Sequence, residues 1–216
     1  MNTIIGNWGP LLDGSVLTLK LFFITLLLSV PLGLLLALMR ISRVRALSLA
    51  TNGYIWLMRG TPLMLQIVFF YFALPILLGP AGALPGLPTA VIAFTLNYAA
   101  YFAEIFRAGI QSIDKGQYEG ARVLGYSYTQ TMRHIILPQV IKRILPPMSN
   151  ETITLVKDTS LVYVIALDDL LKVVRGMVQR DFSMTPFVVA AAFYLLMTLA
   201  LTWGFQRLER RYAAYD

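Results

Sequence analysis

Polar side chains interrupt two of the hydrophobic stretches of this chain, where they could recognise a polar molecule. In the stretch 89–110, Asn97, Tyr101 and Glu104 are spaced i, i+4 and i+7, so they share one face of a helix. The stretch 148–167 contains the polar residues Asn150, Glu151, Thr154, Lys157, Asp158, Thr159 and Ser160. Because a charged side chain that faces lipid costs roughly 2.5 to 3.5 kcal/mol, we expect both stretches to be enclosed by protein.

These polar residues do not form a catalytic dyad or triad, and no metal site is expected. The chain has no cysteine, and its one histidine, His134, has no carboxylate nearby at metal-ligand spacing. The phosphate-binding pattern G-x-x-x-x-G-K-[ST] is absent from the sequence. The sequence therefore predicts a protein that is not an enzyme and has no cofactor of its own.

The composition is that of an integral membrane protein. Of the 216 residues, 57% are hydrophobic and 13% are charged, and the mean hydropathy is +0.68. The net charge of +7 does not indicate a nucleic-acid partner, because the basic residues flank hydrophobic segments instead of forming one patch. They are typical of topology signals next to membrane lipid.

The hydropathy pattern predicts an all-α protein with five transmembrane helices. The expected spans are about 12–39, 51–78, 89–110, 148–167 and 185–206. We expect Pro31 to interrupt the first span and Arg59–Pro62 to interrupt the second. Residues 168–181 predict a short amphipathic helix at the outer surface. The segments assigned to the cytoplasm hold 13 of the 18 Lys and Arg residues, which predicts an outside N-terminus and an inside C-terminus.

The segment 114–138 between the third and fourth spans has the features of a short docking helix. Asp114 gives it a polar start that suits the helix dipole, and Gly125 can end the helix. Pro138 is expected to break or kink the chain after it. The alternative is an ordinary solvated loop, but such a loop has no reason to keep the spacing of Glu119 and Gly125.

The spacing of this segment resembles the EAA loop of bacterial ABC importer permeases. The residues that carry the resemblance are Glu119, Ala121, Gly125, Ile135, Leu137 and Pro138. The one departure from the family pattern is Gly120, where the family has alanine. The resemblance implies a cytoplasmic coupling helix that docks into a groove on a separate ATPase subunit. The implied docking residues are Glu119, Gly120, Ala121, Arg122, Leu124 and Gly125.

Three further stretches resemble the polar amino acid branch of these permeases. They are the Arg-Gly-Thr-Pro at 59–62, the segment around Glu104 and Arg107, and the Lys-Asp-Thr-Ser-Leu at 157–161. The resemblance covers nearly the whole chain and implies a single permease domain, residues 1–216, with the type I importer fold. It also implies location in the bacterial cytoplasmic (inner) membrane.

The resemblance implies a mechanism and a set of partners. An extracytoplasmic binding protein delivers a polar amino acid to a permease dimer, either of identical chains or of paralogues. A dimer of ATPase subunits binds ATP and Mg²⁺ and drives alternating access through the coupling helices. The permease itself supplies the coupling helices and the path of the solute.

An amino acid zwitterion needs partners for both of its charges, since either one is costly to leave unpaired in a dry cavity. Glu104 and Asp158 are candidate partners for its cation and Lys157 for its carboxylate. The candidate neutral ligands are Asn97, Thr61 and Ser160. The open alternative is that the charged residues form structural ion pairs, with Arg107 either joining them or extending toward the membrane surface. Two acidic residues favour a cationic amino acid, such as arginine, although glutamine fits the same branch.

Two other classes of protein share some of these features. A secondary transporter or channel for a small polar solute would also carry intramembrane charges without an ATP site. However, five spans do not divide into equal repeats, and a channel does not explain the spacing of the segment 114–138. A scaffold subunit without a path does not explain the charged fourth span.

Overall fold

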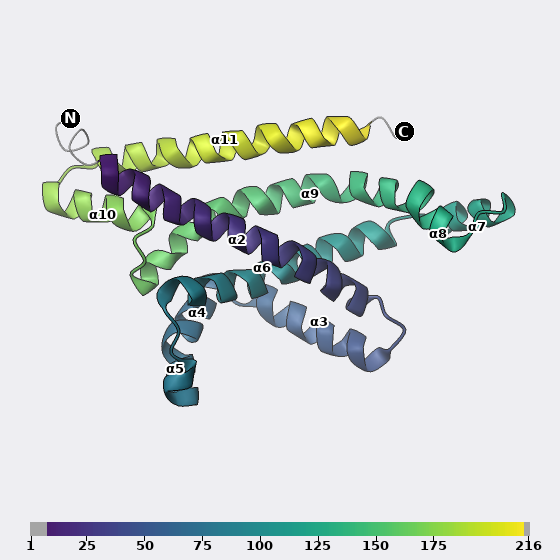
Figure 1. The fold of residues 1–216 in the computed structure, drawn as a ribbon, viewed down its shortest axis with the longest axis horizontal. Coiled ribbons are helices and arrows are strands. Elements are labelled where there is room, and N and C mark those ends of the chain that lie inside the picture. Colours follow the sequence, from purple (N-terminus) through teal and green to yellow (C-terminus); the bar gives the residue numbers. More distant parts are fainter. Residues whose placement is uncertain (1–7, 214–216) are drawn as a thin grey trace.

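The computed structural model describes residues 8–213, and every regular element in that range is helical. Figure 1 labels these elements along the chain. Their bounds are α2 Trp8–Arg40, α3 Arg45–Gly60, α4 Leu63–Val68, η1 Phe69–Ala73, α5 Leu74–Leu78, η2 Gly79–Gly82, α6 Gly86–Gln111, α7 Lys115–Val123, α8 Tyr128–Thr131, η3 Met132–Ile136, α9 Leu137–Asp158, η4 Thr159–Ile165, α10 Leu170–Asp181 and α11 Thr185–Ala213. The prediction of an all-α chain is confirmed for this range.

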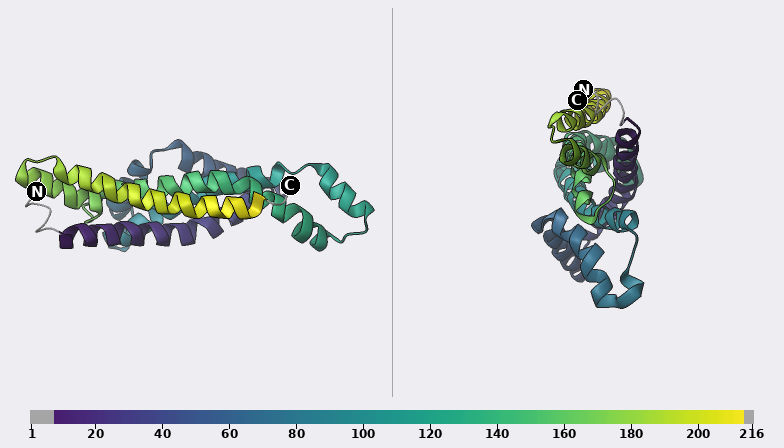
Figure 2. Two further views of the ribbon diagram at one scale, coloured as in Figure 1. Left: turned by 90° about the horizontal axis from the view of Figure 1, so that it is seen from above. Right: turned by 90° about the vertical axis from the view of Figure 1, so that its left-hand side faces the viewer.

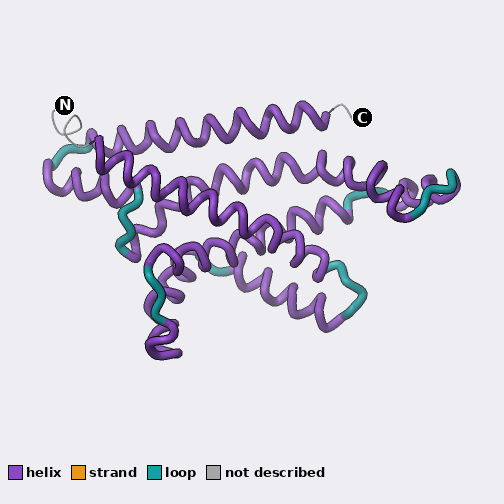
Figure 3. The backbone as a smooth tube through the Cα atoms, in the orientation of Figure 1, coloured by secondary structure: helices purple, strands orange, loops and turns teal. Residues whose placement is uncertain are grey.

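Four long helices give the molecule its elongated shape. Helices α2, α6, α9 and α11 run lengthwise, and α7 and α8 extend beyond them at one end (Figures 1 and 2). Helix α10 lies at the opposite end, where α2 begins, and short loops join most of the helices (Figure 3). The predicted docking segment and the predicted outer helix therefore lie at opposite ends of the bundle.

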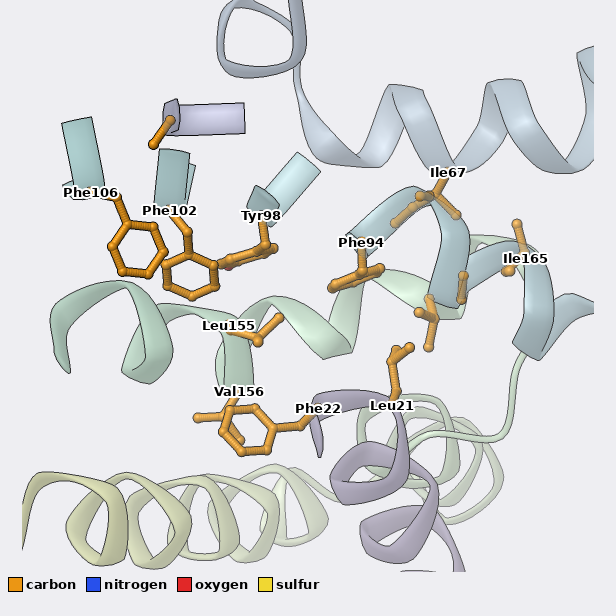
Figure 4. Packing of buried hydrophobic residues seen from close by; sticks show 14 residues of the cluster. Leu21, Phe22, Ile67, Phe94, Tyr98, Phe102, Phe106, Leu155, Val156 and Ile165 are labelled. Carbon is orange, nitrogen blue, oxygen red and sulfur yellow. The ribbon is translucent and has the colours of Figure 1, made fainter. Parts of the chain in front are cut away.

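Helix α6 forms the centre of the core. Phe94, Tyr98, Phe102 and Phe106 recur every four residues along it and are buried (Figure 4). Close contact with α2 depends on Gly33, where a Cβ atom would come within 2.7 Å of the Phe102 Cβ. In lipid, helices associate by close packing of small residues, since lipid tails are as apolar as the side chains. This contact fixes α2 against the helix that carries most of the core.

The break predicted at Arg59–Pro62 is confirmed. Proline has no N–H and forces the residue before it into an extended conformation, and Thr61 has φ −118° and ψ 144°. Helix α3 is consequently a separate amphipathic helix, and the apolar segment long enough to cross a membrane is Leu63–Gly82. The predicted span 51–78 therefore contains two separate helices, and where it enters the membrane stays a prediction.

The expectation that Pro31 interrupts the first hydrophobic helix is wrong. Pro31 does not interrupt α2, which continues to Arg40. Helix α9 starts at Leu137, ahead of the predicted span 148–167, and Pro146 and Pro147 lie inside it. A proline inside a helix removes one backbone hydrogen bond and crowds the carbonyl four residues before it, but buried residues on both sides of the proline pair, Val140 and Ser149, hold α9 against its neighbours.

Four helical segments in the described range are apolar and long enough to cross a membrane. They are Trp8–Arg40, Leu63–Gly82, Gly86–Gln111 and Thr185–Tyr212. In the most apolar part of Thr185–Tyr212 only 6% of the residues are buried, so this helix exposes a surface suited to lipid or to another chain. Helix α9 is too polar to meet the same criterion, and a fifth crossing therefore stays a prediction.

Candidate functional site

A cavity of about 570 Å³ opens where the α3–α4 break meets α6 and α9. We call it the solute cavity. Its lining includes the polar or aromatic residues Arg59, Thr61, Asn97, Tyr98, Tyr101, Glu151, Thr154 and Asp158. Of the six residues predicted to bind solute, the structure brings three together here, namely Thr61, Asn97 and Asp158.

Asp158 has a defined position in the wall of this cavity. It is the last residue of α9, and Tyr98 of α6 donates a hydrogen bond of 2.7 Å to its Oδ2 atom. This bond links α6 to α9 and leaves the Oδ1 atom of Asp158 without a hydrogen bond from Tyr98. Asp158 can therefore accept a further donor, such as an ammonium or guanidinium group.

Glu151 is a cavity carboxylate that sequence reasoning did not select for the site. It lies on the cavity-facing side of α9 together with Thr154 and Asp158, at spacings of three and seven residues. That spacing places them on one helix face, so the signal was present in the sequence. Glu151 and Asp158 give the solute cavity two carboxylates, against the single guanidinium of Arg59.

Asn97 and Thr61 take part in a network that fixes the chain break. The Asn97 Nδ2 atom donates to the Met58 carbonyl at 2.9 Å and to Gln66 Oε1 at 3.0 Å. The Gln66 Nε2 atom donates in turn to the Met58 carbonyl at 2.9 Å and to Thr61 Oγ1 at 2.8 Å. The network satisfies backbone groups at the break, which must be paired at membrane depth. Gln66 was not predicted as part of the site.

Glu104 lies in a neighbouring cavity of about 450 Å³, which we call the inner cavity. Its carboxylate accepts hydrogen bonds from the Arg107 guanidinium at 2.6, 3.1 and 3.1 Å. The alternative of a structural ion pair is therefore the one observed for Glu104. Arg107 pairs with this residue of its own helix instead of extending toward the membrane surface.

Two predicted solute ligands lie away from both cavities. Neither Lys157 nor Ser160 is among the residues that line the solute cavity or the inner cavity. Lys157 is exposed, because it follows Val156, whose side chain is fully buried in the core. Adjacent residues on a helix point about 100° apart, and here Asp158 lines the cavity while Lys157 does not.

The predicted docking helix is α7, and local signals define both of its ends. The Asp114 side chain accepts a hydrogen bond from the Gly116 amide at 2.7 Å and caps the start. At the other end, the Gly125 amide donates to the Arg122 carbonyl and the Tyr126 amide to the Ala121 carbonyl, both at 3.0 Å. Gly125 has φ +78°, so its predicted role as the helix stop is confirmed.

The exposed face of α7 carries apolar side chains. Val123 is 88% exposed and Leu124 is 74% exposed. Five of the six predicted docking residues are exposed, but Ala121 is only 2% exposed, so its side chain is not available for docking. Exposed apolar residues at a helix end are suited to contact with another protein.

The segment after α7 re-aims the chain toward α9. Ser127 and Gln130 form a reciprocal capping box at the start of α8. Burial and the neighbouring Tyr128 raise the pKa of Tyr118, which therefore stays neutral at physiological pH. Pro138 lies in the first turn of α9, after the π-helical turn η3, so it starts that helix and does not break it.

Comparison with known proteins adds a family to this geometry. Residues 29–214 match the family described as binding-protein-dependent transport system inner membrane component. The chain is 38% identical to the arginine transport system permease protein ArtQ of Bacillus subtilis (strain 168), over 95% of this chain and 94% of that protein. It is 39% identical to the probable glutamine ABC transporter permease protein GlnM of the same organism, over 98% and 97% of the two chains.

Solved structures agree with the sequence relatives. A crystal structure of an amino acid ABC transporter with histidines superposes with a TM-score of 0.87 at 36% identity and covers 96% of each chain. An inward-facing MetNI methionine ABC transporter superposes with a TM-score of 0.68 at 19% identity, over 97% of this chain and 95% of that chain. The second likeness concerns the fold alone.

Proposed function

Because this chain belongs to the family of inner membrane components of binding-protein-dependent transport systems, we propose that it carries a cationic amino acid through its solute cavity. The resemblance to amino acid ABC permeases seen in the sequence is confirmed by the family match and the relatives. The chain acts as the permease of an ABC importer. ATP hydrolysis belongs to a separate subunit.

The charge of the solute cavity is the observation that carries the choice of solute. Its lining contains the carboxylates Glu151 and Asp158 and the guanidinium of Arg59. A zwitterion with a cationic side chain offers two cations and one carboxylate, which matches this set of charges. An unpaired charge in such a site is costly, so a neutral amino acid would leave one wall carboxylate without a partner. Lys157 and Ser160 are not part of this proposed set.

The proposal places α7 on the cytoplasmic side as the coupling helix. Its exposed Val123 and Leu124 would dock into a separate ATPase subunit, and the opposite end, with α10, would face the extracytoplasmic binding protein. In this arrangement α9 is the fifth crossing, shielded from lipid by the bundle and by a second permease chain. The opposite ends occupied by α7 and α10 support this orientation. The relatives do not favour the secondary transporter alternative.

The test is ATP hydrolysis by the chain reconstituted with the ATPase and binding protein encoded beside it. Single amino acids are added one at a time, and we expect arginine or lysine to stimulate hydrolysis more than glutamine or glutamate. Stimulation by glutamine alone would contradict the choice of a cationic solute. Failure of the chain to assemble with any ATPase would contradict the coupling role.

A charge reversal on the coupling helix sharpens this test. Glu119→Lys places the opposite charge on the exposed face of α7 and should abolish solute-stimulated hydrolysis. Glu209→Lys makes the same change near the end of α11, at the same end of the bundle, and should leave stimulation unchanged. Equal losses in both variants would show that general charge, and not the docking face, is responsible.

A further inference from the structure

The solute cavity and the inner cavity share Arg59, Tyr101 and Glu151 in their linings. The inner cavity continues from these residues past Glu104 to Ser112 and Arg143, toward the end that carries α7. A solute that leaves the first cavity through the second must therefore pass these three shared residues. We call them the neck.

Arg59 is held in the neck by weak contacts. Its guanidinium carbon lies 5.2 Å from the centre of the Tyr101 ring, which gives a cation–π contact. Its Nη1 atom is 3.9 Å from Glu104 Oε2, a long ion pair, and its side chain is 42% exposed. A partly exposed ion pair of this length contributes little, so Arg59 can move at low cost.

The contrast with Arg107 separates a structural cation from a mobile one. Arg107 binds the Glu104 carboxylate of the same helix through three hydrogen bonds of 2.6, 3.1 and 3.1 Å. Arg59 comes from the last turn of α3, two residues before the extended Thr61 and Pro62, where the chain changes direction. Arg107 is fixed on α6, whereas Arg59 lies beside the interruption between helices α3 and α4.

We propose that Arg59 is a built-in cation that closes the neck when no solute is present, and that a cationic solute passes by replacing it beside Glu151 and Glu104. The two carboxylates then form successive stations between Asp158 and the inner end of the path. Tyr101 provides the surface on which the guanidinium rests in the closed state. This inference rests on the proposed function, because it assigns the inner cavity to the exit route.

The absence of cysteine from the chain makes the neck accessible to a direct test. Thr154→Cys places a thiol in the solute cavity, and Ser112→Cys places one in the inner cavity beyond the neck. The full complex in membrane vesicles, without ATP or solute, is treated from the ATPase side with a trimethylammonium methanethiosulfonate reagent or a neutral one. The rate of permease labelling is measured by mass spectrometry.

We expect Arg59→Gln to accelerate cationic labelling of Thr154→Cys by at least about tenfold, because it removes a like charge from the route. Acceleration by the neutral reagent should be smaller, and labelling of Ser112→Cys should not change. With Arg59→Lys, which keeps the charge, Thr154→Cys should be labelled at close to the rate seen with Arg59 in place. Tyr101→Leu, which removes the resting surface, should give an intermediate rate.

Equal labelling of Thr154→Cys with and without Arg59 would overturn the proposal. Equal acceleration of the cationic and neutral reagents would also overturn it, because that result indicates a loosened structure. Import of a cationic amino acid is measured in the same vesicles. If a cationic amino acid is imported but Arg59→Gln does not change the labelling, the role of Arg59 in the neck is contradicted and the proposed function is not. If the labelling changes as expected but no cationic amino acid is imported, the proposed solute is contradicted and the role of Arg59 in the neck is not.

Discussion

The solute cavity and the coupling segment are built by different kinds of contact. In the cavity, Tyr98 donates a hydrogen bond to Asp158, which lies 60 positions away in the sequence, and Asn97 donates one to the carbonyl of Met58, 39 positions away. In the coupling segment, the bonds that fix the helix ends join residues no more than five positions apart, such as Tyr126 and Ala121. The cavity thus depends on the whole bundle, whereas α7 keeps its shape through its own caps.

This difference fits the two roles. A binding site must hold several charges at fixed separations, and long-range contacts between packed helices provide that rigidity. A docking element must keep its form while it is moved, and local capping makes α7 a unit that can shift without reordering the bundle. Substitutions in one region should therefore leave the property of the other unchanged.

The largest expected effect is on docking. Val123→Asp puts a carboxylate on the most exposed apolar position of α7 and should prevent co-purification with the ATPase, because a charge buried in an apolar interface has no partner. Solute binding to the permease, measured by calorimetry, should persist. Val44→Asp, at an exposed turn between α2 and α3, is the matched control. Normal assembly of the Val123 variant would remove α7 from the interface.

Solute affinity should respond to the other region. Asp158→Asn removes a charge that accepts hydrogen bonds from a cation, an interaction worth about 1.5 to 3 kcal/mol, so we expect solute to bind roughly ten to a hundred times more weakly. Assembly with the ATPase should be unaffected. The control is Asp168→Asn, an exposed carboxylate near α10. An unchanged dissociation constant for the Asp158 variant would exclude this carboxylate from the site.

The same contrast explains what the sequence could predict. The start of α7 at Asp114, its stop at Gly125 and the break at Pro62 follow from the conformational limits of single residues, and all are confirmed. The membership of Asp158 in the cavity followed from the cost of charge in lipid. These inferences need only local or compositional information.

The parts that sequence reasoning missed depend on which helices meet. Glu151 was visible as a polar residue, but its selection over Lys157 required knowing which face of α9 meets α6. The pairing of Glu104 with Arg107 was one of two open alternatives until their distance was known. Gln66 lies in an apolar run and gains its role only because the chain break brings the Met58 carbonyl beside it.

A smaller effect should separate positioning from direct contact in the cavity. Tyr98→Phe removes the hydroxyl that orients Asp158 but leaves the aromatic packing of α6 intact. A hydrogen bond of this kind contributes about 0.5 to 1.5 kcal/mol, so solute affinity should fall by a few fold. Tyr128→Phe, on exposed α8, should not change the affinity. A loss as large as that of Asp158→Asn would mean that Tyr98 itself contacts the solute.

A final pair of variants distinguishes two glycines of the coupling segment. Gly125 has φ +78°, and alanine in this conformation costs about 1 to 2 kcal/mol, so Gly125→Ala should speed hydrogen exchange of the α7 amides roughly 5- to 30-fold. Gly120 lies within α7 with open space around it, and Gly120→Ala should slow the exchange, since alanine favours a helix interior. Exchange in α2 should not change in either variant. Faster exchange in both variants would show that α7 is held by side-chain packing and not by its cap, and the contrast with the solute cavity would then fail.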